Sequence, residues 1–337
     1  MQSADSITLT LETGGFENMQ NYRLYRIILK PRSPLHIGDK EGIYNITEQF
    51  IHSDTLFSGI INCYCMLFGN DETERLVESF CSGNVPFRIS SAMPRIKDAY
   101  YVYKPLSLDL MDKLRSDDYK KVKKIRFIPE ETLVNGFGHG KYQMAGQFLV
   151  PNEDNIDETS AYFIEREIER VAVDRVTHAT NLFYYSQCVA GKDASLWFYL
   201  KVSEDVKKNV LAAIRLLCDE GIGGERSIGL GCFDFEKLEA EEISCSNADS
   251  FVNLSVYSPK SQEELSALTD YELDERAGYI YSVFSNKNIK RKKIKVLTEG
   301  STFSRIVDGR VVDVTPESFK SHRVIRYALS YLLPYKT

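Results

Sequence analysis

The sequence predicts an α+β protein, and three observations support this fold class: length, composition and the order of patterns. The chain has 337 residues, enough for one large domain or two medium-sized ones. Its hydrophobic content of 43% and charged content of 27% are ordinary for globular domains. The patterns run as strand, helix and then several strands, which fits α+β domains better than regular βαβ alternation. We find no strict internal repeat.

Composition excludes several classes of protein. No run reaches the roughly 18 apolar residues that a membrane helix needs, and we expect no membrane partner. The N-terminus lacks the basic start and apolar middle of a secretory signal, so we expect a cytoplasmic protein. The seven cysteines include no CxxC pair, so we expect reduced thiols and no zinc or other metal site. No cofactor is predicted either.

Charge is unevenly distributed along the chain. The net charge is −6, which argues weakly against a general nucleic-acid coat protein. Residues 113–126 nevertheless carry seven Lys or Arg residues, and residues 287–295 carry six. These runs are either solvated loops or a track for a defined anionic ligand, and charge alone leaves both interpretations open.

Two long helices are predicted from apolar residues at helical spacing. The first covers residues 53–68, with Ser53 or Asp54 as its N-cap and Gly69 closing it. The second covers residues 203–221, with its first residue, a serine, as the cap and acidic residues in the first turn.

Strands are predicted on both sides of these helices. Residues 22–31 are rich in aromatic and β-branched residues and end at a proline. Residues 170–177 and 182–189 read as a hairpin with a polar turn at His178–Asn181. Residues 85–150 mix short strand-like runs with loops. Further strands are predicted at residues 196–202 and 231–238.

The last 87 residues follow a polar segment, residues 239–250, that we interpret as a linker. After it comes a strand from Phe251, and then a helix that opens with the capping-box pair Ser261 and Glu264. Four more strand-like runs complete the chain: GYIYSVF, IKVLTEGSTF, GRVVDVTP and RVIRYALSYLL.

The segment GIGGERSIGLG, residues 221–231, holds five glycines between a helix and a strand. A Walker A loop would end in Lys followed by Ser or Thr, and a Rossmann loop would lie between a strand and a following helix, so neither applies. The preceding helix directs its partly negative end at the loop, so loop N–H groups and Arg226 would have to hold any anion. A tight helix-to-strand connection needs one glycine, Gly221, as its cap. We interpret the others as marking close backbone approach by a nucleotide chain.

The order of helix, GIGGERSIGLG and strand resembles the glycine-rich loop of the RAMP superfamily, the ferredoxin-like (RRM-like) subunits of CRISPR effector complexes. LKPRSPLHIGDKEGI with FIHSDTLFSGIINCY, and VDRVTHATNLFYY, resemble the amino-terminal signature and thumb hairpin of the type III-A (Csm) subunit that caps the crRNA 5′ end. NLSVYSPKSQEEL, KRKKIKVLTEGSTF and RVIRYALSYLLP resemble its carboxy-terminal domain. The resemblance begins near residue 22 and runs to the end of the chain.

This resemblance implies two ferredoxin-like modules, with a β-hairpin thumb near residues 170–190. The expected organisation is a leader at 1–21, an N-terminal RAMP domain at 22–240 and a C-terminal domain at 241–337. It implies a non-catalytic protein of antiviral defence that binds the repeat-derived 5′ tag of crRNA. It also implies two protein partners in the Csm complex, the large polymerase/nuclease subunit and a backbone RAMP subunit.

A single-stranded tag is held through its phosphates and its splayed bases. We expect the glycine segment to contact phosphates, although Glu225 does not fit this role. We expect the helix start near residue 52 to offer free N–H groups to an anion, unless its polar residues only cap the helix. We expect the hairpin to wedge or read a base, and the second basic run to extend the track. The predicted RNA-binding residues are His36, Gly38, His52, Ser53, Arg175, Thr177, Asn181, Phe183, Gly223, Gly224, Arg226, Ser227, Gly229, Gly231, Lys290, Arg291 and Lys292.

The alternative function is a metal-independent, repeat-specific CRISPR endoribonuclease. His36 would then act on a 2′-OH as general base or acid, with His139 as a weaker candidate. A compact set with a second acid or base and a Lys or Tyr is not readable in the sequence. A DNA-reading transcription factor is a poor third option, because no recognition helix appears.

Overall fold

The computed structural model describes residues 22–38, 47–114, 119–138, 141–151, 163–243, 249–282 and 289–336. The predicted leader at 1–21 lies outside these ranges. In the described part of the chain, the main sheet has the strand order β11, β1, β10, β3, β4, β5, β7 and β6, with β2 also paired to β10. Its strands are β1 (Tyr22–Pro31), β2 (Phe87–Ile89), β3 (Met93–Ile96), β4 (Ala99–Tyr103), β5 (Phe127–Pro129), β6 (Tyr142–Ala145), β7 (Phe148–Pro151), β10 (Ala194–Ser203) and β11 (Phe233–Glu239).

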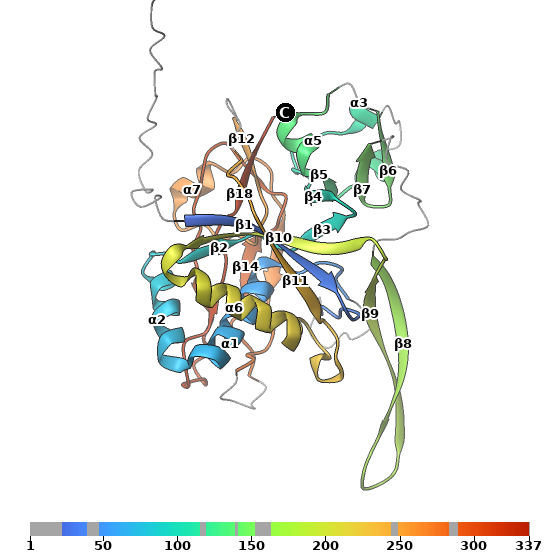
Figure 1. Cartoon of the computed structure of the whole chain (residues 1–337), viewed down its shortest axis with the longest axis vertical. Helices are drawn as coiled ribbons and strands as arrows, with labels where there is room; N and C mark the ends of the chain where they lie inside the picture. Colours follow the sequence, from blue (N-terminus) through green and yellow to red (C-terminus); the bar gives the residue numbers. More distant parts are fainter. Residues whose placement is uncertain are drawn as a thin grey trace, which may run out of the picture.

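The two long predicted helices are confirmed and lie on one side of this sheet, together with a third that the sequence patterns did not reveal. They are α1 (Ser53–Phe68) and α6 (Glu204–Glu220), and the additional helix is α2 (Asn70–Cys81). Figure 1 shows all three gathered on the same side of β1, β10 and β11. A Cβ on Gly59 of α1 would lie 2.9 Å from Leu217 Cδ1 of α6, so the helices pack closely at a residue without a side chain.

The segment between β3 and β7 extends the sheet away from these helices, as seen in the upper part of Figure 1. Besides its strands, it contains three short helices, which are α3 (Met111–Leu114), α4 (Tyr119–Val122) and α5 (Glu130–Asn135). Rings of Tyr103, Phe127 and Phe148 stack inside it, with centroids 4.9 Å and 5.5 Å apart along the series. This apolar interior is continuous with the main core.

A long hairpin of β8 (Phe163–Val173) and β9 (Thr180–Ala190) projects from the body (Figure 1). The hairpin prediction is confirmed, but its turn was placed too late in the sequence. The strands pair from Phe163 with Ala190 to Val173 with Thr180, so the turn covers residues 174–179. Asp174 Oδ1 fixes this turn by accepting from the backbone N–H groups of Val176 and Thr177, at 2.8 and 2.6 Å.

The C-terminal part contains small sheets and one short helix among its described residues. Its elements are β12 (Ser250–Asn253), α7 (Gln262–Ser266), β13 (Leu273–Arg276), β14 (Ile294–Leu297), β15 (Thr302–Phe303), β16 (Val312–Asp313), β17 (Ile325–Arg326) and β18 (Leu332–Tyr335). The Ser261 cap is confirmed, because its side chain accepts from the Glu264 N–H. The described residues do not form the two-helix, four-stranded ferredoxin-like module expected here. The described residues of GYIYSVF, 278–282, form no strand and make only isolated bridges.

The C-terminal part packs directly onto the N-terminal part. The ring of Phe57 on α1 stacks on Tyr327, with centroids 5.0 Å apart, and Tyr199 on β10 stacks on Tyr331 at 5.1 Å. Val252 and Leu333 belong to the same buried cluster as the main sheet. The predicted linker does fall between β11 and β12, but the two parts share one hydrophobic core.

No helix within the described ranges is both long and apolar enough to cross a membrane.

Candidate RNA-binding site

The glycine segment begins as the cap of α6. Gly221 has φ = 83°, in the left-handed region that glycine tolerates, and its N–H donates to the carbonyl of Leu217 at 2.9 Å. A Cβ on Gly221 would lie 2.5 Å from the carbonyl oxygen of Leu230. The expectation that Gly221 caps the helix is confirmed.

The next glycines make room for a different segment of the same protein. A Cβ on Gly223 would lie 2.2 Å from the carbonyl oxygen of His36, and one on Gly224 would lie 2.7 Å from His36 Cδ2. The Gly224 N–H donates to that His36 carbonyl at 2.8 Å. The glycine segment is therefore clamped against the loop that follows β1.

Gly231 completes the clamp at the other end of the segment. Its Cβ would lie 2.1 Å from the carbonyl oxygen of Ile222, and its N–H donates to the Pro34 carbonyl at 2.8 Å. We expected these glycines to let a nucleotide chain approach. The structure gives a different reason for Gly223, Gly224 and Gly231, which is close packing of the protein backbone on itself.

The middle of the segment forms an exposed rim, defined here as residues 225–229. Glu225, Ser227 and Gly229 are exposed, and a Cβ on Gly229 would meet nothing within 4 Å. Arg226 is half-buried, and its guanidinium lies 4.4 Å from the ring centroid of Tyr281. A guanidinium stacked on a ring still presents its edge N–H groups, which suit a phosphate.

His36 lies beneath this rim in the protein interior. Its side chain is buried, and Nδ1 lies 2.6 Å from the carbonyl oxygen of Ser186, so Nδ1 carries a proton and donates. The ring also meets Tyr185 edge-on, with centroids 6.1 Å apart. His36 therefore joins the loop after β1 to the base of the hairpin and is not exposed for RNA contact. Gly38, two residues later, is exposed.

The start of α1 is not the open anion site that the sequence indicated. The N-cap residue is His52 and no side chain caps the helix, so the assignment of Ser53 or Asp54 as N-cap is wrong. Ser53 is fully buried; its N–H donates to Ser91 Oγ at 2.8 Å, and its own Oγ accepts from the Val256 N–H at 2.9 Å. The protein's own groups fill the positions that a phosphate would need.

Asp54 is held by two arginines from the C-terminal part. Arg276 donates to both of its carboxylate oxygens, at 3.0 and 3.2 Å, and Arg326 Nη1 forms a further ion pair. Burial would raise the pKa of Asp54, but Arg276 and Arg326 together hold it well below its usual range. Asp54 is thus a buried anchor between the two parts of the chain.

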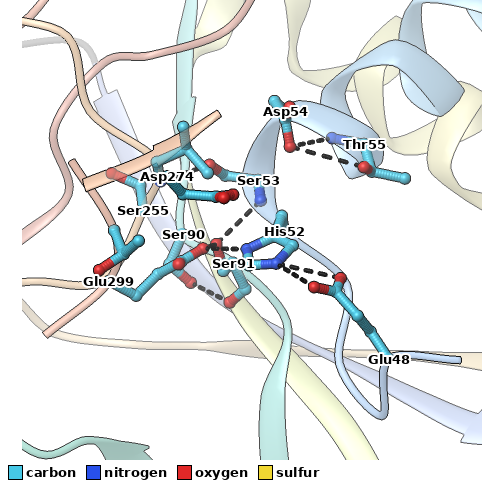
Figure 2. Close-up of polar contacts among 12 residues, drawn as sticks. Glu48, His52, Ser53, Asp54, Thr55, Ser90, Ser91, Ser255, Asp274 and Glu299 are labelled. Carbon is cyan, nitrogen blue, oxygen red and sulfur yellow. Dashed lines mark hydrogen bonds and ion pairs between the residues drawn. The ribbon is translucent and has the colours of Figure 1, made fainter. Parts of the chain in front are cut away.

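His52 belongs to the same buried junction. Figure 2 shows its ring between two carboxylates, with Nδ1 2.8 Å from Glu299 Oε1 and Nε2 3.1 Å from Glu48. Ser91 also donates to Glu299. Burial opposes the charged ring, but Glu299 and Glu48 outweigh it and raise the pKa of His52 to about 10. The structure therefore assigns His52 and Ser53 to an internal joint, in place of the predicted RNA contact.

The four predicted hairpin residues are all exposed. Arg175 and Thr177 lie in the turn, where the Thr177 hydroxyl donates to Asp174 Oδ1 at 2.9 Å. Asn181 and Phe183 lie two residues apart on β9 and therefore on the same face of the ribbon. Phe183 is 41% exposed, which makes its ring available for stacking.

The basic residues of the second run surround an aromatic pair that sequence reasoning did not assign to the site. Lys290 and Lys292 are exposed, whereas Arg291 is half-buried. Lys290 Nζ lies 5.5 Å from the ring centroid of Tyr279, and Tyr279 and Tyr281 are both about half exposed. The sequence does contain a signal for this pair, namely two tyrosines just before a basic run. Their alternation with other residues, however, predicted a strand.

The other predicted residues add little to the candidate site. Residues 115–118 and 287–288 of the basic runs, and His139, lie outside the described residues. Lys113 and Arg126 of the first run lie near the rings of Phe137 and Phe127, at 5.3 and 5.8 Å. Within the described ranges, no group of three or more His, Cys, Asp or Glu side chains is placed to hold a metal ion.

Comparison with known proteins agrees with this architecture. The family model described as the RAMP superfamily matches residues 28–234, more than half of the chain. The chain belongs to the RAMP superfamily. A second model, described as the CRISPR Csm4 C-terminal domain, matches residues 246–335. The resemblance of this RAMP protein to the Csm subunit is therefore confirmed over both of its parts.

Individual relatives of this RAMP protein carry the same description. The "CRISPR system Cms protein Csm4" of Methanocaldococcus jannaschii is 28% identical over 343 residues, covering 87% of this chain and 89% of its own. A solved Csm3–Csm4 subcomplex of a type III-A CRISPR-Cas interference complex matches with a TM-score of 0.64 at 22% identity, covering 93% of this chain and all of that one. A Csm1–Csm4 cassette in complex with cA4 matches with a TM-score of 0.57 at 19% identity, covering 93% and 98%. These two structures share the fold of this chain.

Proposed function

We propose that this chain is a non-catalytic subunit of a type III-A CRISPR effector complex that binds the repeat-derived 5′ tag of crRNA. The observation that carries the proposal is the match of residues 246–335 to the Csm4 C-terminal domain, next to a RAMP domain in the same chain. The relative from M. jannaschii is also described as Csm4, and the match covers 89% of its length.

The surface that best suits RNA combines the rim with the basic run. Tyr281 stacks under Arg226, and its neighbour Tyr279 pairs with Lys290 through an isolated β-bridge. Cationic groups beside exposed rings are the combination that binds single-stranded nucleic acid, with phosphates on the cations and bases on the rings. We name this surface the rim surface. Its residues are Arg226, Ser227, Gly229, Tyr279, Tyr281, Lys290 and Lys292.

The hairpin is proposed as a second contact that separates or reads bases. Phe183 and Asn181 share one face, so a ring for stacking and an amide for hydrogen bonding lie side by side there. Base stacking on an aromatic side chain contributes about 1–3 kcal/mol per base.

The same proposal names two protein partners. The related chains occur in solved complexes with Csm3 and with Csm1, and we propose that a Csm3-like backbone subunit and a Csm1-like large subunit flank this chain in the cytoplasm. We also propose that the N-terminal part is a ferredoxin-like module. Its strand order β11, β1, β10, β2, with α1 and α6 in the connections, supports this.

The structure disfavours the endoribonuclease alternative. A general acid or base must reach the 2′-OH that it activates. His36 is 6% exposed, and its Nδ1 is engaged by the Ser186 carbonyl. The described contacts of the ring are with the Ser186 carbonyl, Gly224 and Tyr185.

One pair of measurements tests the proposal. The full chain is pulled down from its host and the bound RNA is sequenced; we expect crRNA with an intact repeat-derived 5′ tag, together with large and backbone subunits. Purified chain is then incubated with repeat RNA in EDTA, and no cleavage is expected. A 2′,3′-cyclic phosphate product that disappears in His36→Ala would contradict the proposal and support the nuclease.

A further inference from the structure

A cavity of about 370 Å³ lies between helices α1 and α2 and two segments of the C-terminal part. This volume falls at the lower end of the range for small-molecule sites. Its apolar side is formed by Phe57 and Ile61 of α1, Val77 of α2 and Val324. Of the residues of the rim surface, Tyr281 also lines this cavity.

Arg291 lines the cavity and forms no ion pair with another described residue. Its Nε is buried and has no hydrogen-bond partner among the described residues. The nearby carboxylate, Asp54, is already bonded to Arg276 and Arg326. Burial, together with repulsion from Arg326, lowers the pKa of Arg291 to about 10. A half-buried guanidinium whose Nε has no partner among the described residues is costly, so an anion in the cavity would reduce this electrostatic penalty.

Hydrogen-bonding side chains also line the cavity. They are Asn62 on α1, Asn70 and Glu74 on α2, which are bonded to each other, and Glu78, which forms an ion pair with Arg323. Amides and carboxylates at this position can accept hydrogen bonds from the N–H groups of a nucleobase. Glu78 is paired with Arg323, but Glu74 would repel additional phosphates, so charge and volume together favour a ligand with a single phosphoryl group.

We propose that this cavity binds a nucleoside monophosphate, with the phosphoryl group at Arg291 and the base between the apolar side and the amide-bearing wall. The ligand is either a free nucleotide or one nucleotide of a bound RNA, because both present the same chemistry. Tyr281 lines the cavity and also stacks on Arg226 of the rim surface, so the cavity adjoins that surface.

Binding of AMP to the full chain, measured by calorimetry and by the shift in Tm, tests this inference. We expect saturable binding by AMP, and weaker binding by both inorganic phosphate and adenosine. Arg291→Met should weaken AMP binding roughly tenfold or more, since a charge-assisted hydrogen bond is lost. The same variant should leave the Tm without ligand unchanged or higher, because it removes a half-buried charge that forms no ion pair with a described residue.

Two further variants separate a ligand site from a structural role. Arg75→Met is the control, because Arg75 lies on α2 with an exposed side chain paired only with Glu72; it should bind AMP like the wild type. Val77→Trp should fill the cavity and abolish the Tm shift. The inference fails if AMP does not bind, if Arg291→Met binds AMP as tightly as the wild type, or if Arg291→Met is destabilised.

The source of the nucleotide is decided by adding a single-stranded RNA oligonucleotide. If the oligonucleotide competes with AMP, the site is assigned to RNA; if both bind at once, it is assigned to a free nucleotide. Both outcomes support nucleotide binding in the cavity. The inference does not depend on the proposed function. A chain that binds AMP but does not retain tagged crRNA would refute only the latter.

Discussion

Two short polar segments of this chain look alike in sequence and differ in what contacts them. The start of α1 and the rim each combine a serine with an acidic residue beside a helix end. At α1, Ser53 and Asp54 are buried under groups from the C-terminal part. At the rim, Ser227 and Gly229 remain exposed, and the only described partner of Arg226 is a half-exposed ring.

This difference shows that an anion site is defined by what the rest of the fold brings to it. The free N–H groups of a helix start attract an anion, but Asp54 provides the negative charge and two arginines neutralise it. The comparison predicts that changes at α1 affect stability, whereas changes at the rim affect RNA binding.

The largest effect is expected for Asp54→Asn. Removing this charge leaves Arg326 without a counterion among the described residues and Arg276 with only the half-exposed Asp274. Breaking such a buried pair costs about 3–5 kcal/mol of the free energy of unfolding. Urea denaturation of the isolated chain measures the loss. The matched control is Asp274→Asn, because Asp274 also faces Arg276, at 3.6 Å, but is half exposed. The control should lose less than about 1 kcal/mol, and equal losses for the two variants would contradict the buried-anchor assignment.

Local signals in the sequence were sufficient for the long elements. The ends of α1 and α6 were predicted correctly, because Gly69 and Gly221 terminate them within one residue. The helix α2 gave too little signal, since Leu76 and Phe80 are its only buried apolar residues. The helix starting after Ser261 ends at Ser266, earlier than its polar pattern indicated.

Long-range partners explain why parts of the site were assigned differently from the structure. The arginines that bind Asp54 lie 222 and 272 residues away, so no local pattern distinguishes a cap from an anchor. The same holds for the glycines, because the His36 carbonyl that contacts Gly223 lies on a distant loop. Exposed residues such as Arg175 and Phe183 were predicted as surface groups, and their RNA contacts stay predictions.

The glycine pair Gly223 and Gly229 sharpens the comparison next. Both have positive φ, 97° and 88°, but only a Cβ at Gly223 meets backbone, 2.2 Å from the His36 carbonyl oxygen. We expect Gly223→Ala to lose about 3 kcal/mol in urea denaturation and Gly229→Ala about 1 kcal/mol. Each variant is the other's control. Losses of the same size would mean that the glycine segment is not clamped as described.

His52 makes the α1 junction sensitive to pH. Its pKa is raised from 6.5 to about 10 on folding, so its stabilisation is complete below about pH 6.5 and is lost as pH rises toward 10. The free energy of unfolding should fall by roughly 2 kcal/mol between pH 7 and 8.5. His52→Gln, which cannot be protonated, should show a flatter profile across that window. A wild-type profile parallel to that of the variant would show that His52 does not carry the charge.

Arg226→Ala is expected to change stability least and to test the rim most directly. Its stacking on Tyr281 contributes only about 0.5–1 kcal/mol to folding, so the Tm should move little. If Arg226 holds a phosphate, RNA affinity should fall several-fold at low salt, and the slope of log K against log salt should decrease by about 1. The control is Arg23→Ala, since Arg23 is exposed at the end of β1 that pairs with Ser203, far along the strand from the glycine segment. An unchanged slope for Arg226→Ala would remove the rim from the RNA path and leave the hairpin as the main contact, because the buried start of α1 offers no phosphate position.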